Sequence, residues 1–291
     1  MISAKNVTLQ YPGGKGIFDI NFEVKEGTVT GYLGPNGAGK TTTIRTLMGF
    51  MKPAKGSCTI NGLDCYKNAA EIKRTLGYIP GEIAFPGGMS CGEYLKYQCE
   101  LRGLKNHEYM DALTERFELD TKGTIKRFSK GMKQKVGIIT AFMHDPDVLI
   151  LDEPTSGLDP LMQNEFISLI LEEKKKGKTI LMSSHMFEEV ERTCDDVLII
   201  KDGRLVAQSD VKKLKSTKRK GFIVQTPDMD KLKTLGFKME KITDSGCEVY
   251  VKGEELDAFI KKLGTVTVTG LDIKAQSLED IFLNYYGMEA K

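Results

Sequence analysis

Gly34-Pro35-Asn36-Gly37-Ala38-Gly39-Lys40-Thr41 is a continuous stretch that fits the pattern G-x-x-x-x-G-K-[ST]. Glycines lack a Cβ, so the backbone can adopt φ > 0 and its N–H groups can converge on phosphate oxygens. Lys40 brings a positive charge for the β- and γ-phosphates, and the Thr41 hydroxyl is a ligand for Mg²⁺. The stretch, called the phosphate loop below, predicts that the chain binds a nucleoside triphosphate such as ATP.

The segments on either side of this loop agree with that prediction. Residues 28–33 have the composition of a strand that runs into the loop, and residues 41–48 have the composition of a helix that leaves it. The N-terminus of such a helix carries a partial positive charge that favours a bound anion. The expected arrangement is a strand, a phosphate-binding loop and a helix.

A second segment predicts the chemistry of the site. Residues 148–151 are a continuous apolar run, which is typical of a strand buried on both faces of a parallel sheet. Asp152 and Glu153 follow directly, at the carboxyl edge where open α/β sheets carry their sites. We expect Asp152 to hold Mg²⁺ through its water shell. Glu153 is the candidate general base that orients and polarises the water attacking the γ-phosphate.

Several sequence motifs along residues 1–205 together resemble those of the ATP-binding-cassette (ABC) ATPases. The segment 152–160 resembles the Walker B and D-loop region, and the segment 128–134 resembles the signature motif that precedes it. Ser183-Ser184-His185 resembles the H-loop, and Tyr11 stands where the family has an aromatic residue stacked on adenine. This ordered set is more specific than the phosphate loop alone, which many NTPases share.

The resemblance implies a role for each matched residue. In this family two cassettes face each other head to tail, so Ser129 and the amide of Gly131 would bind the γ-phosphate held by the partner chain. His185 would bridge the γ-phosphate, the attacking water and the opposite D-loop. The nucleotide contacts implied are those of Tyr11, the phosphate loop, Thr42, Ser129, Gly131 and Asp159.

One position departs from the family pattern. Most members carry a glutamine at the loop that joins the sheet to the helical subdomain, where it ligates Mg²⁺. Here the matching residue is Gly81, and Glu82 follows it. Either the Glu82 carboxylate replaces the glutamine as a metal ligand, or water takes that contact. Lys130 and Met132 also replace commoner signature residues.

The composition is that of an ordinary globular protein, with 40% hydrophobic and 28% charged residues. No apolar run approaches the roughly 20 residues that cross a bilayer, and residues 1–5 lack the apolar core of a secretory signal. We therefore expect a cytoplasmic protein, peripheral on the inner face of the cell membrane, that works with a separate transmembrane permease. The net charge of +2 gives no reason to expect a nucleic-acid partner, and the six scattered cysteines predict reduced thiols.

The pattern along the chain predicts two domains. Residues 1–215 are expected to form an α/β cassette of the P-loop NTPase type, with an antiparallel β-layer near the N-terminus and a helical subdomain at about 85–145. The basic run 212–220 is expected to be a linker, or else a contact with anionic lipid headgroups. Residues 216–291 have a β-α-β-β-α-β pattern, with strands at 222–226, 237–242, 247–251 and 266–273 and a last helix at 278–286. This α+β pattern is typical of a ferredoxin-like accessory domain that stabilises the dimer, regulates it or binds a small ligand.

Two classes of function follow. The first is an ATPase subunit that powers a membrane transporter. The residues of the motifs resemble those in subunits of bacterial drug, peptide-antibiotic or ion exporters. The second is a soluble ABC ATPase that acts on ribosomes or nucleic acid. A single cassette without a long heptad insertion favours the first class. The second cassette of the pair is a copy of this chain or a different ATPase subunit.

Overall fold

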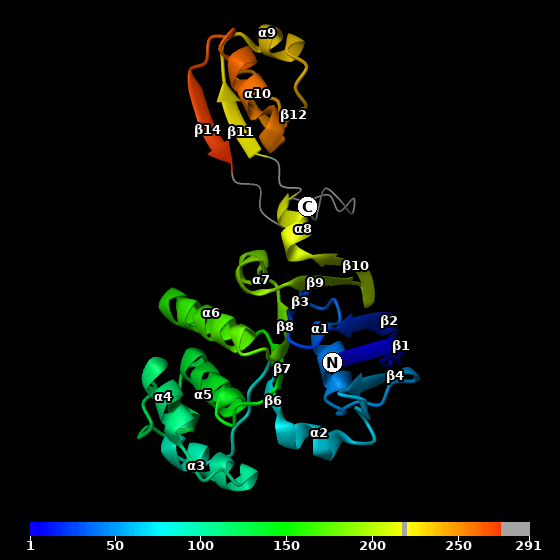
Figure 1. Cartoon of the computed structure of the whole chain (residues 1–291), viewed down its shortest axis with the longest axis vertical. Coiled ribbons are helices and arrows are strands. Elements are labelled where there is room, and N and C mark those ends of the chain that lie inside the picture. The colour runs from blue at the N-terminus through cyan, green and yellow to red at the C-terminus, as the bar shows by residue number, and fades with distance from the viewer. Residues whose placement is uncertain (217–219, 275–291) are drawn as a thin grey trace. The chain divides into compact units, whose positions relative to one another are not determined.

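The computed structural model describes residues 1–216 and 220–274 (Figure 1). By its internal contacts the chain divides into a first unit, residues 1–211, and a second unit, residues 212–291. The division falls four residues before the expected boundary at 215/216. Each unit has its own cluster of buried apolar side chains. The predicted helix at 278–286 lies outside the described residues.

A six-stranded sheet forms the centre of the first unit. Its strands, in spatial order, are β10 (Arg204–Asp210), β9 (Asp196–Lys201), β3 (Val29–Leu33), β8 (Thr179–Ser184), β7 (Val148–Asp152) and β6 (Leu76–Ile79). All neighbours are parallel except β10, which pairs with β9 antiparallel. Every residue of β3, β7 and β8 is buried, which agrees with the apolar runs 148–151 in β7 and 180–182 in β8. The carboxyl ends of β3, β7 and β8 therefore meet at one edge.

A second, antiparallel sheet lies close to the N-terminus. It contains β2 (Gly16–Val24), β1 (Ile2–Gln10), β4 (Lys55–Ile60) and β5 (Leu63–Asp64), in that order. Helix α1 (Lys40–Leu47) contacts β2 and β4 of this sheet and β7 of the large sheet. Ile44 and Leu47 of α1 belong to the apolar cluster that both sheets share, and both are fully buried. The antiparallel β-layer expected from the sequence is therefore confirmed.

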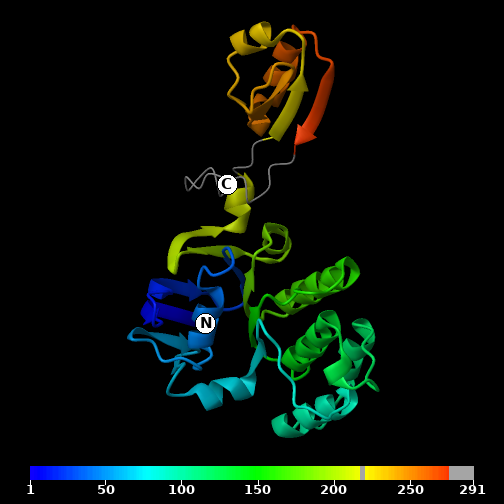
Figure 2. The same ribbon diagram turned by 180° about the vertical axis from the view of Figure 1, so that it is seen from behind.

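The remaining helices of the first unit surround the large sheet. They are α2 (Ala69–Thr75), α3 (Cys91–Arg102), α4 (Glu108–Arg116), η1 (Ile125–Arg127), α5 (Lys130–Phe142), α6 (Pro160–Lys175) and α7 (Phe187–Thr193). Helix α8 (Val211–Ser216) begins at the last residue of the first unit, and its other residues belong to the second unit. Figures 1 and 2 show α3, α4 and α5 grouped away from β1, β2 and β4. This group is the helical subdomain predicted at about 85–145. Helix α3 begins with a capping box, in which Ser90 and Glu93 bond each other's backbone N–H groups.

Between residues 220 and 274, the described part of the second unit contains a four-stranded antiparallel sheet, the helices α9 and α10, and the short 3₁₀-helix η2. Its elements are β11 (Lys220–Gln225), α9 (Met229–Thr234), β12 (Met239–Glu240), β13 (Gly246–Val251), η2 (Gly253–Glu255), α10 (Leu256–Leu263) and β14 (Gly270–Lys274), and the sheet order is β12-β13-β11-β14. This is the predicted β-α-β-β-α-β sequence of elements. Phe222 of β11 packs against Phe259 of α10, with ring centroids 4.8 Å apart.

Two strand predictions in this unit were wrong in their bounds. The strand predicted at 237–242 has only two residues, because Lys241 has φ of 46° and leaves the extended conformation. The strand predicted at 266–273 begins at Gly270. Val266 instead belongs to the turn after α10, where its N–H bonds the carbonyl of Leu263 and its side chain is buried. At Val266, the packing of a buried side chain outweighed strand propensity.

Among residues 1–216 and 220–274, none of the helices has the length and apolarity that a bilayer span requires.

Candidate nucleotide-binding site

The phosphate loop connects β3 to α1 at the carboxyl edge of the large sheet. Gly37 and Gly39 have φ of 81° and 110°, a backbone conformation that side-chain-bearing residues rarely adopt. A Cβ on Gly34 would lie 2.4 Å from the carbonyl oxygen of Ile200, so the chain has no room for a side chain there. The glycine spacing seen in the sequence is therefore required by this fold.

Lys40 is the first residue of α1 and its side chain is almost completely buried. Its ammonium group donates hydrogen bonds to the carbonyl oxygens of Gly34, at 2.7 Å, and Pro35, at 3.3 Å. It also forms an ion pair with Glu153, with 3.2 Å between Nζ and Oε1. The positive charge thus lies inside the loop, beside the first carboxylate after β7.

Asp152 ends β7 and is fully buried. Its Oδ1 accepts a hydrogen bond of 2.5 Å from the Ser183 hydroxyl, whereas its Oδ2 has no hydrogen-bond partner among the described residues. Burial raises the pKa of Asp152, and the hydroxyls of Ser183 and Thr41 partly offset that rise. A buried carboxylate oxygen without a partner, next to a threonine hydroxyl, is a donor set that fits a hard divalent cation such as Mg²⁺.

Glu153 has the positive φ of 48°, which is uncommon for a residue with a side chain. Its N–H bonds the carbonyl oxygen and the hydroxyl of Ser183, and these two bonds hold the turn in this conformation. The turn directs the carboxylate between Lys40 and His185, whose Nδ1 lies 3.2 Å from Oε2. Lys40, Glu153 and His185 therefore form one polar cluster at the sheet edge. Backbone strain of this kind concentrates at functional sites.

The residues matched to the signature and the D-loop form a second group within the same chain. Ser129 is the N-cap of α5, and its hydroxyl accepts the N–H of Met132. Asp159 is the N-cap of α6, and its carboxylate accepts the N–H of Met162. Among the described residues, no hydrogen bond or ion pair joins Ser129 or Asp159 to the Lys40–Glu153–His185 cluster.

The start of α5 packs directly against the D-loop. A Cβ on Gly131 would lie 2.5 Å from the carbonyl oxygen of Gly157, so only glycine allows this approach. Lys130 donates a hydrogen bond of 2.7 Å to the hydroxyl of Ser156. The amide of Gln134, which is buried, donates one of 2.7 Å to the carbonyl of Pro154. These contacts tie the signature segment to the loop that follows Glu153.

Two other predicted residues, Tyr11 and Glu82, have less contact with this cluster. Tyr11 is partly buried after β1, and its hydroxyl donates to the sulfur of Met51 at 3.2 Å. Glu82 is exposed, and no ion pair or hydrogen bond in the part of the chain described here links it to Thr41 or Asp152. The preceding Gly81 lies close to Asp152 instead. A Cβ added to Gly81 would be only 2.9 Å from Oδ2 of Asp152.

Sequence reasoning missed the role of Ser183. It pairs with Asp152 across the adjacent parallel strands β7 and β8 and supports both acidic residues. Its signal in the sequence is a polar residue at the end of an otherwise apolar strand. The Lys130–Ser156 and Gln134–Pro154 bonds were also missed, since nothing local in the sequence indicates them.

Comparisons with known proteins agree with this geometry. Residues 17–156 match the family model described as ABC transporter. The chain is 38% identical over 211 residues to the ABC transporter ATP-binding protein NatA of Bacillus subtilis, covering 70% of this chain and 86% of NatA. It is also 38% identical over 234 residues to the bacitracin transport ATP-binding protein BcrA of Bacillus licheniformis, covering 79% of this chain and 76% of BcrA.

A solved structure described as the ATP-binding subunit of an ABC transporter superposes on this chain with a TM-score of 0.69 and 33% identity. The superposition covers 74% of this chain and 92% of the other. The α/β cassette fold predicted from the sequence is therefore confirmed.

Proposed function

Because this chain belongs to the ABC transporter ATP-binding proteins, we propose that it is the ATP-hydrolysing subunit that powers an exporter through a separate membrane permease. The observation that carries the proposal is the cluster of Lys40, Glu153 and His185 beside the buried carboxylate of Asp152. It combines a phosphate-binding cation, a candidate base and a candidate metal ligand at one sheet edge.

ATP binding would begin at the phosphate loop. Its N–H groups and the helix dipole of α1 would receive the phosphates, and Lys40 would exchange its contacts with Gly34, Pro35 and Glu153 for phosphate oxygens. Thr42, in the first turn of α1, would add to this cradle, and Tyr11 would stack on the adenine ring. The lysine is already buried in the loop, so little side-chain entropy would be lost on binding.

Hydrolysis would depend on Glu153. Once Lys40 turns to the phosphates, the Glu153 carboxylate would accept a proton from the attacking water, and His185 would help to orient that water. Thr41 and Asp152 would hold Mg²⁺, with Glu82 or water completing its ligands. Bound Mg²⁺ supplies charge neutralisation on the β- and γ-phosphates.

The complete site would require a second cassette. Ser129 and Gly131 lie at the start of α5 and make no bond to this chain's own Lys40–Glu153–His185 cluster within the described residues, so they would face the ATP of a partner cassette. Asp159 in the D-loop would join the same interface. Head-to-tail pairing would place two ATP molecules between two such chains, or between this chain and a different ATPase subunit.

Export through a permease would place the chain on the cytoplasmic side of the cell membrane, bound peripherally to that permease. Two findings support this part of the proposal. The residues of the motifs resemble those in subunits of bacterial exporters, and one relative carries the name of a bacitracin transport protein. The second unit, residues 212–291, would serve as an accessory domain.

The partner is tested by affinity purification of the tagged chain from detergent-solubilised membranes of its native host. A polytopic membrane protein recovered in fixed ratio would support the transporter function and would indicate the cargo. Ribosomes or nucleic acid in its place would favour the soluble ATPase, and the absence of any membrane protein would refute the export proposal.

The nucleotide site is tested separately with Lys40→Ala. Loss of the charge-assisted contacts to phosphate is expected to weaken ATP binding at least about 100-fold. Lys25→Ala, which removes an exposed lysine before β3, is the matched control and should bind ATP as the parent chain does. ATP binding unchanged by Lys40→Ala would contradict the assignment of the loop.

A further inference from the structure

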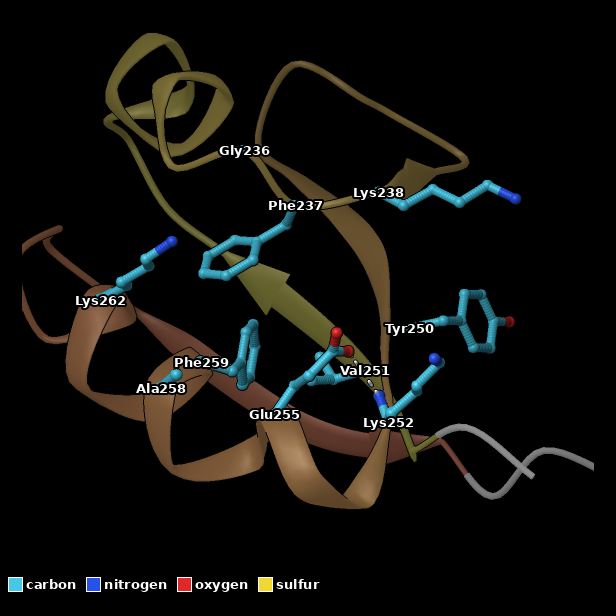
Figure 3. A pocket seen from close by; sticks show the side chains of 10 residues that line it. All are labelled: Gly236, Phe237, Lys238, Tyr250, Val251, Lys252, Glu255, Ala258, Phe259 and Lys262. Carbon is cyan, nitrogen blue, oxygen red and sulfur yellow. Dashed lines mark hydrogen bonds between the residues drawn. The ribbon is translucent and has the colours of Figure 1, made fainter. Parts of the chain in front are cut away.

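The second unit contains a cavity of about 390 Å³ beside α10 (Figure 3), but the aromatic rings of its lining are already packed against the domain's own groups. Phe259 is 1% exposed between Phe222 and Phe237. The ammonium of Lys262 lies over the Phe237 ring, 5.6 Å from its centre. This cavity therefore gives no free aromatic surface, and the group that extends the ATPase chemistry is a buried carboxylate of the first unit.

That carboxylate belongs to Glu189 of α7, which follows His185 by four residues. Its side chain is almost completely buried. Its Oε2 accepts a hydrogen bond of 2.6 Å from the Ser184 hydroxyl, whereas its Oε1 has no hydrogen-bond partner in the part of the chain that the structure describes. A buried carboxylate with one oxygen unpaired costs free energy, so the stability of the fold does not account for it.

The Ser184 hydroxyl joins this carboxylate to the turn between β8 and α7. It accepts the N–H of Met186 at 2.9 Å and donates to Glu189. Ser184 and Met186 stand on either side of His185, so the two bonds hold both ends of the segment that carries the imidazole. The His185 side chain is 52% exposed, and packing contributes little to its orientation. The conformation of the turn therefore determines where its Nδ1 lies relative to Glu153, 3.2 Å away.

A second hydroxyl beside the Glu189 carboxylate comes from the segment after the candidate base. Burial raises the pKa of Glu189, and the hydroxyls of Ser184 and Thr155 partly offset that rise. Thr155 is itself buried and follows Glu153 by two residues. The Glu189 carboxylate thus lies between the segment that follows the base and the turn that carries His185.

From these contacts we propose that Glu189 is a positioning residue for ATP hydrolysis. Its carboxylate holds the turn from Ser184 to Met186 in the conformation that keeps His185 against Glu153. Without the carboxylate the turn would move, and the attacking water would lose the orientation that His185 provides. This role depends on that of His185 in the proposed function.

The first test measures single-turnover phosphate release and ATP affinity with the full chain. Glu189→Ala should lower the hydrolysis rate about tenfold, since a small displacement of an orienting group costs a loss of this order. The dissociation constant of a fluorescent ATP analogue should stay within about twofold, because the phosphate loop is unchanged. Glu189→Gln keeps an oxygen that accepts the Ser184 bond, so it should keep at least about half of the parental rate.

Glu188→Ala, at an exposed position of the same helix, is the matched control and should change neither quantity. Hydrolysis by Glu189→Ala at the parental rate, or by Glu189→Gln as slowly as by Glu189→Ala, would overturn the proposal. So would a loss of ATP affinity as large as the loss of rate, which would indicate a structural defect.

Combination with His185→Ala shows whether Glu189 acts through His185. In a chain without the imidazole, Glu189→Ala should lower the rate by less than about twofold, because the turn then has no group to orient. Ser184→Ala removes the hydroxyl between the carboxylate and Met186, so it should slow hydrolysis as Glu189→Ala does and is an independent variant of the same contact. If the separate losses multiply in the double variant, Glu189 does not act through His185. A parental rate for His185→Ala alone would instead contradict the role of His185 in the proposed function.

Discussion

Replacement of Glu153 by Gln separates the two tasks that we assign to this carboxylate. Glu153 forms an ion pair with Lys40, with 3.2 Å between the charged atoms, and it lies 3.2 Å from His185. Glutamine keeps the size and the hydrogen-bonding oxygen but removes the negative charge. The variant should therefore bind ATP more tightly and hydrolyse it far more slowly.

The magnitude for binding follows from the Lys40–Glu153 pair. At an effective dielectric constant of about 20, two unit charges at this separation attract by about 5 kcal/mol. Desolvation and partial exposure of Glu153, at 23% of its side chain, reduce the net value to about 1 kcal/mol. That energy opposes transfer of Lys40 to the phosphates, so its removal should tighten ATP binding about fivefold.

Hydrolysis should fall about 100- to 10,000-fold, since general base catalysis of this type contributes that much. The two measurements are the dissociation constant for a fluorescent ATP analogue and the rate of phosphate release. Glu188→Gln, at an exposed position in the nearby α7, is the matched control and should change neither. Hydrolysis by Glu153→Gln at the parental rate would show that Glu153 is not the base. Weaker ATP binding would show that its pairing with Lys40 does not compete with phosphate.

Three further predictions follow from the geometry. Gly131→Ala should lower ATP hydrolysis about tenfold and leave ATP binding unchanged. The added Cβ would lie 2.5 Å from the carbonyl oxygen of Gly157 and would push that residue away. Gly87→Ala, where nothing lies within contact distance of the added Cβ, is the control. Asp152→Asn should raise the free energy of unfolding by about 1 kcal/mol at pH 7, since it removes a buried charge, and should abolish the Mg²⁺ dependence of ATP binding. Burial lowers the pKa of His144 to about 4. Because the folded state then binds this proton less readily than the unfolded state, the free energy of unfolding should fall by about 2 kcal/mol as pH drops from about 6.5 to about 4. This value allows for the partial exposure of His144.

The signs of the two pH effects differ and provide internal checks. Because the pKa of Asp152 is raised, its ionised form destabilises the fold, and the advantage of Asp152→Asn should shrink as acid protonates the parent carboxyl. The unfolded state binds the His144 proton more readily than the folded state, so His144→Gln should flatten the acid profile measured by urea unfolding. If the stability of His144→Gln falls in acid as steeply as that of the parent chain, the assignment of His144 is contradicted. If the stability advantage of Asp152→Asn grows in acid, the assignment of Asp152 is contradicted.

Elements with a local physical requirement could be predicted from the sequence. The phosphate loop needs glycine at Gly37 and Gly39 because the backbone there has positive φ. The strand before Asp152 needs a continuous apolar run because both faces of β7 are buried. Such requirements are met by residue type alone, so the cassette and its two motifs were identified without coordinates.

Elements that depend on packing were predicted less well. The strand at 266–273 was placed four residues early because Val266 has strand propensity but is used in the turn after α10. Lys241 ends β12 through its positive φ, which its residue type does not favour. At Val266, where strand propensity and burial of the side chain disagree, the packing decides the start of the strand.

Residue types alone were enough to identify a nucleotide-binding cassette, since glycines and apolar runs act on the backbone of their own segment. The contacts that arrange its chemistry join residues far apart in the chain, such as Lys40 with Glu153 and Asp152 with Ser183. These contacts exist only because β3, β8 and β7 lie side by side in parallel register, which brings their carboxyl ends together. Register and the close approach of backbones are properties of the assembled sheet, and no single segment of the sequence specifies them.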